Sequence, residues 1–171
     1  MSRQRRSSIT IVGIDPGTGR CGYSVLTFTG QKPTVVTYGV FEYGSKMPLP
    51  ERLVCLERDM AELLDVHNPT GLAVETLIFN KNITTAMQVS EARGVIVLSG
   101  AKRGIAIQNC TPLQVKMAVT GYGRADKSQV KQMIKLQCGL QDMHKIDDAI
   151  DAIAIGITGY HLMQTELRIK N

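Results

Sequence analysis

The chain has 171 residues, an apolar fraction of 43% and a charged fraction of 20%, which is typical of one soluble globular domain. Its formal charge is +5, but three of these charges come from Arg3, Arg5 and Arg6, so the charge favours a polyanionic partner only weakly. No stretch approaches the roughly 20 apolar residues of a membrane span, and no secretory apolar region follows the basic start. We therefore expect a cytoplasmic protein without a membrane segment.

The cysteines and histidines are scattered and form no metal-binding or redox motif. They are Cys21, Cys55, Cys110 and Cys138, and His67, His144 and His161. Because no CxxC pair or His-linked spacing is present, a zinc site or a thiol nucleophile is not expected. The cysteines are interpreted as small core residues of a reduced compartment.

Three strand-like segments open the chain, at residues 9–15, 22–29 and 34–43. Each is rich in β-branched or aromatic residues. Pro-Gly-Thr-Gly ends the first, and Gly30 and Pro33 separate the second from the third. Strands joined by such short turns favour an antiparallel meander.

The rest of the chain alternates helical patterns with short strands. Apolar residues recur at three- and four-residue steps from 51 to 67, which indicates an amphipathic helix. Further strands are expected at 71–75 and 106–109, and further helices at 84–101, from Pro112, at 127–137 behind an Asp126 cap, and at 146–162. This order predicts an α/β fold: a mixed five-stranded sheet, an antiparallel meander followed by βαβ crossovers, flanked by helices. We expect a basic tail at 1–8, one domain at 9–163 and a short C-terminal tail at 164–171.

Acidic residues end two of the expected strands. Asp15 follows the first strand and Glu75 ends the fourth. If these strands are parallel neighbours, both carboxylates emerge at the edge of the sheet where ligands collect in α/β folds. The plainer alternative is that Asp15 only shapes its Asp-Pro-Gly turn and that Glu75 is a solvated strand end.

The last helix carries three more acids beside an isoleucine stripe. Asp151 is surrounded by alanine and isoleucine, where a carboxylate costs stability unless a cation or a donor pairs with it. Asp147 and Asp148 lie four and three residues earlier, so either can share a face with Asp151. Both are also favoured at a helix N-terminus for electrostatic reasons, and we accept that explanation for Asp147. Spacing alone does not choose between them as a partner of Asp151.

Several carboxylates at one sheet edge repel each other unless a cation lies between them. Hard oxygen ligands in this number suit Mg²⁺ or Mn²⁺. Two such ions about 4 Å apart can activate water and stabilise the leaving oxygen in phosphodiester hydrolysis. The acidic pattern therefore predicts a metal-dependent nuclease.

The acidic motifs resemble those of the RuvC family of bacterial Holliday-junction resolvases. The similar segments are Ile11-Val-Gly-Ile-Asp-Pro-Gly-Thr-Gly, Leu72-Ala-Val-Glu, Glu91-Ala-Arg-Gly, Gln114-Val-Lys, Lys127-Ser-Gln-Val and Asp148-Ala-Ile-Asp-Ala-Ile-Ala-Ile. In order and spacing they cover roughly residues 11 to 160. The resemblance implies an RNase H-like fold.

The resemblance also implies an activity and its partners. It implies a homodimer that binds four-way junction DNA and resolves it by symmetric paired nicks, with 5′-phosphate and 3′-hydroxyl ends, in recombination and repair. Two metal ions (Mg²⁺ or Mn²⁺) would be bound by Asp15, Glu75, Asp148 and Asp151. Lys116 and Lys127 would contact the DNA backbone. RuvA and RuvB, the branch-migration proteins, would be further partners.

The sequence departs from the family pattern at two places. The family's stacking aromatic aligns with Ile78, and Phe79 one residue later is our candidate for that platform, with plain core packing as the alternative. Near the fourth ligand, where some relatives carry a histidine, the chain reads His144-Lys-Ile-Asp-Asp, so Asp147 is a substitute candidate for Asp148.

Three other functions are weighed against junction resolution. Gly13-Ile-Asp-x-Gly-Thr resembles the first phosphate loop of actin-like ATPases and sugar kinases, but those proteins need two lobes and this chain is long enough for one. A RuvC-like nuclease acting on structured RNA would share the acidic site. A catalytically inactive junction-binding domain would have lost acids that are all present here.

The helix at 84–101 is the candidate dimer interface. It carries apolar residues on more than one face, with Met87 and Val89 as extras. Two symmetric cuts are most simply made by two sites related by a two-fold axis. Burial against the sheet is the alternative explanation of this pattern.

Overall fold

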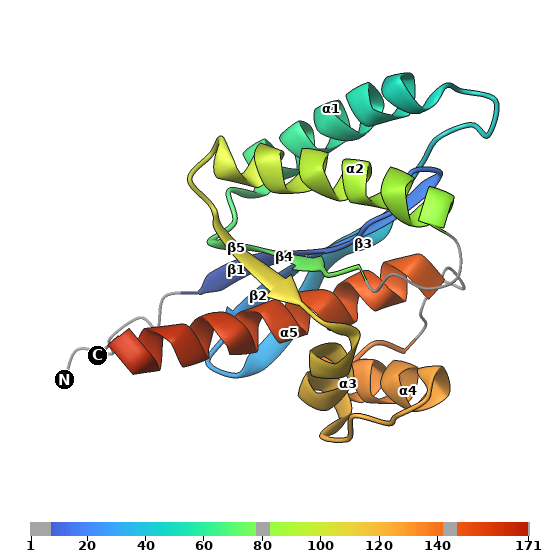
Figure 1. Cartoon of the computed structure of the whole chain (residues 1–171). Coiled ribbons are helices and arrows are strands. Elements are labelled where there is room, and N and C mark those ends of the chain that lie inside the picture. Colours follow the sequence, from blue (N-terminus) through green and yellow to red (C-terminus); the bar gives the residue numbers. More distant parts are fainter. Residues whose placement is uncertain (1–7, 78–82, 142–146, 171) are drawn as a thin grey trace.

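In the computed structural model five strands form one mixed sheet with helices on both faces (Figure 1). The structure describes residues 8–77, 83–141 and 147–170. The strands are β1 (Ile9–Asp15), β2 (Arg20–Thr29), β3 (Lys32–Glu42), β4 (Gly71–Glu75) and β5 (Ala106–Cys110). The helices are α1 (Leu49–His67), α2 (Ile83–Ala101), α3 (Pro112–Thr120), α4 (Lys127–Cys138) and α5 (Asp147–Lys170).

The strand order across the sheet is β3-β2-β1-β4-β5. β1, β2 and β3 form an antiparallel meander, and β4 runs parallel to both β1 and β5. The predicted meander and crossovers are therefore confirmed, as is the prediction that the first and fourth strands are parallel neighbours. Val12 lies opposite Leu72 and Ile14 opposite Val74, so β1 and β4 end at the same edge of the sheet.

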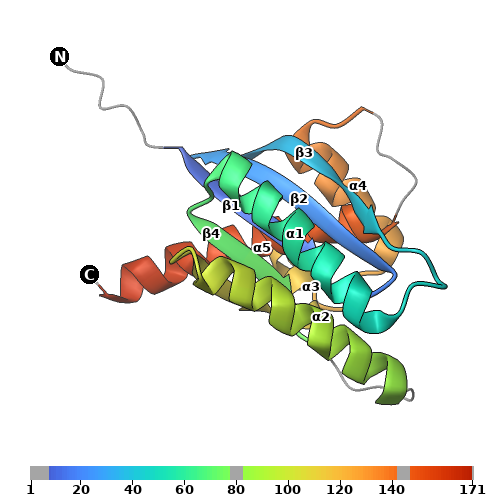
Figure 2. The same ribbon diagram turned by 90° about the horizontal axis from the view of Figure 1, so that it is seen from above.

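Side chains of alternate residues along the strands build two cores, one on each face of the sheet. Val12 and Ile14 of β1 belong to the core under α1 and α2, whereas Ile11 belongs to the core over α5, α3 and α4. Figure 2 shows α1 and α2 lying over the sheet, with α5 on the opposite side. Asp15, the last residue of β1, comes four residues after Ile11 and therefore lies on the same face of the sheet, the side of α5.

Two glycines allow α5 to lie directly against the sheet. A Cβ atom added to Gly13 would come within 2.2 Å of the Ala152 carbonyl oxygen, and one added to Gly22 within 2.0 Å of the Asp148 carbonyl oxygen. Ser24 strengthens the contact because its hydroxyl donates to the same Ala152 oxygen at 2.7 Å. This close approach brings the first turns of α5 to the edge where β1 and β4 end.

The end of α5 differs from the prediction. The helix runs to Lys170, and so includes residues 164–170 that the sequence pattern assigned to a tail after Leu162. The apolar periodicity stops near Leu162, but the following residues favour helix, and Glu166 accepts a hydrogen bond from the Gln108 amide at 3.1 Å. The predicted helix start at 146 and the tail residues 1–7 lie outside the described part of the chain.

A smaller difference concerns one strand end. β3 begins at Lys32 and includes Pro33, which an edge strand tolerates because one side of its backbone needs no partner.

The cysteines are free thiols, and two of them, Cys21 and Cys110, are buried. Burial raises the pKa of each of these two thiols to about 12. The expectation that the cysteines are small core residues is confirmed for these two, whereas Cys55 and Cys138 are only partly buried. None of the helices in the described ranges is long and apolar enough to cross a membrane.

Candidate active site

The ends of β1 and β4 place two acids on the α5 side of the sheet. Asp15 is the last residue of β1 and Glu75 the last residue of β4. Two residues before each of them, the strand touches α5: Gly13 meets Ala152, and Ala73 meets Gly159. Because side chains alternate along a strand, Asp15 and Glu75 lie on this same face.

The first turns of α5 bring two more acids to this edge. Asp148 and Asp151 are three residues apart, so they lie on neighbouring parts of one helix face. Both are partly exposed, whereas the isoleucines and alanines that follow them are buried. Asp147, the first residue of α5, is exposed. The predicted group of Asp15, Glu75, Asp148 and Asp151 therefore comes together at one place.

The electrostatics show that these carboxylates act on one another. Burial, together with the charges of Glu75, Asp151 and Asp148, raises the pKa of Asp15 to about 8. Burial and the charge of Asp151 raise the pKa of Glu75 to about 7. The pKa of Asp151 is also raised, mainly by burial, although Lys127 opposes the shift. A buried group of like charges favours protonation or a bound cation.

Two basic side chains of the protein partly neutralise the group. The Lys127 ammonium lies 3.7 Å from Asp151 Oδ2, and Arg20 Nε lies 3.3 Å from Asp148 Oδ2. Arg20 also pairs with Glu42, because its Nε lies 3.3 Å from Glu42 Oε1 as well. Since Arg20 divides its charge between two carboxylates, negative charge remains in excess at this edge.

A cavity of about 330 Å³ opens beside the acids. Glu75 and Asp151 line one part of it, and Lys116 and Lys127 another. Capping boxes fix the two helices that carry these lysines: Thr111 with Gln114 begins α3, and Asp126 with Gln129 begins α4. The lysines predicted to contact DNA thus lie beside the predicted metal ligands. A larger cavity of about 470 Å³, bounded by β2, β3 and α1, contains none of the four acids.

The four acids fit divalent cations by the chemistry of their donors. Carboxylate oxygens are the ligands that Mg²⁺ and Mn²⁺ prefer. Across the described ranges, no three acidic, histidine or cysteine side chains are arranged to hold an ion as they stand. Arg20 lies 3.3 Å from Asp148 and Lys127 lies 3.7 Å from Asp151, so an ion held by these two carboxylates would compete with both basic side chains.

Sequence reasoning missed two arginines near the site. Arg20 begins β2 and reaches Asp148, a contact that no sequence spacing indicates. Arg93, on α2, donates to the backbone carbonyl of Glu75 at 3.2 Å; its Glu91-Ala-Arg-Gly segment is part of the family resemblance, which assigns Arg93 no role. Phe79, the candidate stacking residue, and its neighbour Ile78 lie outside the described residues.

The comparison with known families decides what kind of chain carries this site. A sequence model of the family described as crossover junction endodeoxyribonuclease RuvC matches residues 11–159. The chain belongs to the RuvC family. The match includes all four acids and both lysines, so the predicted resemblance is confirmed.

Individual relatives agree with this assignment. The RuvC of Halothermothrix orenii is 45% identical over 149 residues, which are 87% of this chain and 90% of that protein. The structure of Thermus thermophilus RuvC in complex with a Holliday junction substrate is 29% identical with a TM-score of 0.86, covering 92% of this chain and 97% of that one. The yeast mitochondrial Holliday junction resolvase Ydc2, at 17% identity and a TM-score of 0.66, shares the fold. The predicted RNase H-like resolvase architecture is thus confirmed.

Proposed function

We propose that this RuvC-family chain is a structure-specific endonuclease that resolves four-way (Holliday) DNA junctions by symmetric paired nicks, in recombination and repair. The observation that carries the proposal is the group of four carboxylates at one sheet edge, two of which, Glu75 and Asp151, line a cavity together with Lys116 and Lys127. The bound junction in the Thermus thermophilus structure supports this substrate. RNA cleavage and inactive junction binding are less well supported, because the acids are all present and the relatives are junction endonucleases.

The four acids have a shared role in this proposal. Asp15, Glu75, Asp148 and Asp151 would hold two divalent ions, Mg²⁺ or Mn²⁺, with Asp147 as the substitute for Asp148. Such ions activate water and stabilise the leaving oxygen of a phosphodiester. Both Asp147 and Asp148 raise the pKa of Asp151, and Asp148 is favoured because it also raises the pKa of Asp15 and is less exposed. The raised pKa values of these carboxylates support the proposal, because a bound cation would stabilise their charged forms.

The basic residues would place the DNA. Lys116 and Lys127 line the cavity beside the acids, so each can contact a phosphate next to the cleaved bond. Lys127 would leave Asp151 for the DNA backbone when the ions bind. Phe79 stays our candidate for the base-stacking residue. Hydrolysis at this site would leave 5′-phosphate and 3′-hydroxyl ends.

The assembly belongs to the same proposal. Two symmetric nicks favour a homodimer, and α2 offers exposed apolar side chains for its interface, with Ile83 70%, Met87 58% and Leu98 52% exposed. RuvA and RuvB are proposed as further partners. A cytoplasmic location fits a DNA substrate and an oligomer of this kind.

A nicking assay tests the proposed function. The full chain is incubated with a synthetic mobile four-way junction, the matching linear duplex and a structured RNA, each with Mg²⁺, Mn²⁺ or EDTA. We expect metal-dependent, paired nicks on the junction and little cleavage of duplex or RNA. Preferential cleavage of RNA, or metal-independent nicking, would contradict the proposal.

A further inference from the structure

Arg93 links α2 to the ends of two neighbouring strands. Its Nε donates to the backbone carbonyl oxygen of Glu75 at 3.2 Å, and its Nη2 donates to Oδ1 of Asn109. Glu75 ends β4, and Asn109 is the penultimate residue of β5. The partly buried Arg93 side chain therefore bridges the adjacent ends of β4 and β5.

The backbone of Glu75 lies at the limit of the sheet. The register between β1 and β4 ends at Ile14 and Val74, one residue before Glu75. On the other side, Glu75 still pairs with Cys110, and the amide of Thr76 donates to the Cys110 carbonyl at 2.8 Å. The position of Glu75 relative to Asp15 on β1 thus depends on contacts from β5 and from Arg93.

The chemistry of the contacts indicates a role in geometry. Both acceptors of Arg93, a backbone carbonyl and an amide side chain, are uncharged. The planar guanidinium presents several donors in a rigid fork, whereas a lysine ammonium is a single point of charge on a flexible stem. A lysine at this position would preserve the charge and lose the bridge between the two strand ends.

We propose that Arg93 is a positioning residue for metal-dependent cleavage. By holding the end of β4, it sets where the Glu75 carboxylate meets Asp15 and Asp151. Because Arg93 is part of α2, it also connects the helix proposed for dimerisation with the active site. This inference rests on the proposed function, since it assigns Arg93 a role in the same metal site.

The test compares Arg93→Lys and Arg93→Gln with the wild-type chain. Two readouts are used: junction nicking against Mn²⁺ concentration, and Mn²⁺ binding to the DNA-free protein by calorimetry. Residues that orient metal ligands typically change metal affinity or activity by roughly 10- to 100-fold when replaced. We expect both variants to lose Mn²⁺ affinity and nicking within this range, and to bind junctions normally in EDTA.

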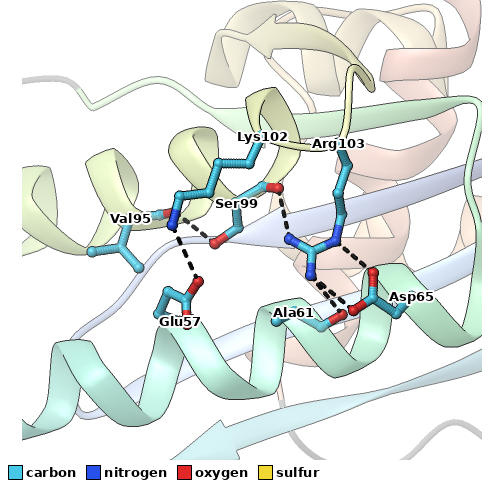
Figure 3. A network of polar contacts seen from close by, with 7 residues as sticks. All are labelled: Glu57, Ala61, Asp65, Val95, Ser99, Lys102 and Arg103. Atoms are coloured by element: carbon cyan, nitrogen blue, oxygen red, sulfur yellow. Dashed lines mark hydrogen bonds and ion pairs between the residues drawn. The ribbon is translucent and has the colours of Figure 1, made fainter.

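Arg103→Lys is the matched control. Arg103 lies two residues after the end of α2 and also bridges several acceptor groups, the Ser99 and Ala61 carbonyls and the Asp65 carboxylate, but at the contact with α1 (Figure 3). Its replacement should leave the Mn²⁺ dependence unchanged. Asn109→Ala keeps Arg93 and its contact with Glu75 and removes only the second acceptor, so we expect a smaller loss, of roughly threefold to tenfold.

The outcomes separate the alternatives. If Arg93→Lys binds Mn²⁺ and nicks like wild type while Arg93→Gln loses junction binding, Arg93 is a DNA charge contact and the proposal is wrong. If Arg93 variants melt early, Asn109→Ala decides: unchanged Mn²⁺ affinity in that variant would overturn the proposal. If wild type nicks no junction with any metal, the proposed function fails, whereas the calorimetric comparison still tests Arg93.

Discussion

Two charged regions of this molecule shift the pKa values of their carboxylates in opposite directions. Between α1 and α2, two acids each have a basic partner: Arg103 contacts Asp65 at 2.6 Å and Lys102 lies 3.7 Å from Glu57 (Figure 3). There the Arg103 hydrogen bond lowers the pKa of Asp65. At the sheet edge, burial and neighbouring acids raise the pKa values of Asp15, Glu75 and Asp151.

The difference separates acids that stabilise the fold from acids held for a ligand. A carboxylate used for structure is paired and exposed, so its charge costs little. A carboxylate that is partly buried among other acids is costly to keep charged, unless a cation arrives from outside the chain. The sheet edge is therefore the part of the described chain where added metal should have the largest effect.

The largest expected effect is the loss of cleavage in Asp15→Asn. This change removes one ligand charge and leaves the shape almost unchanged, so we expect nicking to fall by roughly 1000-fold or more, with junction binding kept. Single-turnover nicking and a gel-shift assay in EDTA measure the two properties. Asp65→Asn makes the same chemical change between α1 and α2 and should nick at the wild-type rate. Equal losses in both variants would remove the distinction between the two regions.

The second prediction concerns the pH dependence of stability without metal. The pKa of Asp15 is about 8 in the folded chain, against an ordinary value of 3.8. The folded state therefore binds more protons than the unfolded state between these values, and its stability falls as the pH rises from about 4 to 8. The asparagine side chain cannot ionise, so the Asp15→Asn variant should gain stability relative to wild type as the pH rises: the difference between their free energies of unfolding should grow across this range.

Urea unfolding in EDTA at pH 5 and pH 8.5 measures this advantage. One pKa unit corresponds to about 1.4 kcal/mol, and the partial exposure of Asp15 reduces the effect, so we expect the gap to widen by roughly 1–3 kcal/mol. Adding Mn²⁺ should stabilise wild type more than the variant. If the difference in unfolding free energy between variant and wild type is the same at both pH values, the ionised form of Asp15 does not destabilise the fold.

Much of this site followed from the sequence because strand ends and helix spacing are local features. Asp15 and Glu75 each end a short apolar strand, and parallel pairing of β1 with β4 was enough to bring them to one edge. Asp151 stood out because it interrupts an apolar helix. Asp148 was harder to assign, because Asp147 fits the helical spacing equally well; in the structure Asp148 is the less exposed of the two and raises the pKa of Asp15.

The contacts that sequence reasoning missed are long-range side-chain contacts. Arg20 reaches Asp148 across 128 positions of the chain, and Arg93 of helix α2 reaches the backbone of Glu75 at the end of strand β4. Long, flexible side chains leave no periodic pattern that would indicate their partners. The end of α5 was missed for a related reason. Beyond Leu162 the helix has little apolar periodicity, and Glu166 is held by a hydrogen bond from Gln108 of the distant strand β5.

Arg20→Gln should have a moderate effect, in the opposite direction to the loss of a ligand. Arg20 occupies Asp148 in the metal-free chain and adds positive charge beside the ions, so its removal should lower the Mn²⁺ concentration for half-maximal nicking. Because the pair is half exposed, we expect a change of only about two- to fivefold, and less in high salt. Lys102→Gln, which removes a charge between α1 and α2, is the control. An increased Mn²⁺ requirement in Arg20→Gln would mean that Arg20 orients Asp148 and does not compete with the ion.

The smallest expected effect is on stability at the α1–α2 contact. Asp65→Asn removes the acceptor charge of Arg103, but Arg103 keeps its hydrogen bond to the Ser99 carbonyl at 3.1 Å. The carboxylate is exposed, so its charge is screened and the pair contributes little. We expect a small decrease in Tm that disappears in high salt, with no dependence on added Mn²⁺. A salt-independent loss, or a Tm response to Mn²⁺ that differs from wild type, would show that the two regions are coupled through α2, the helix that also carries Arg93.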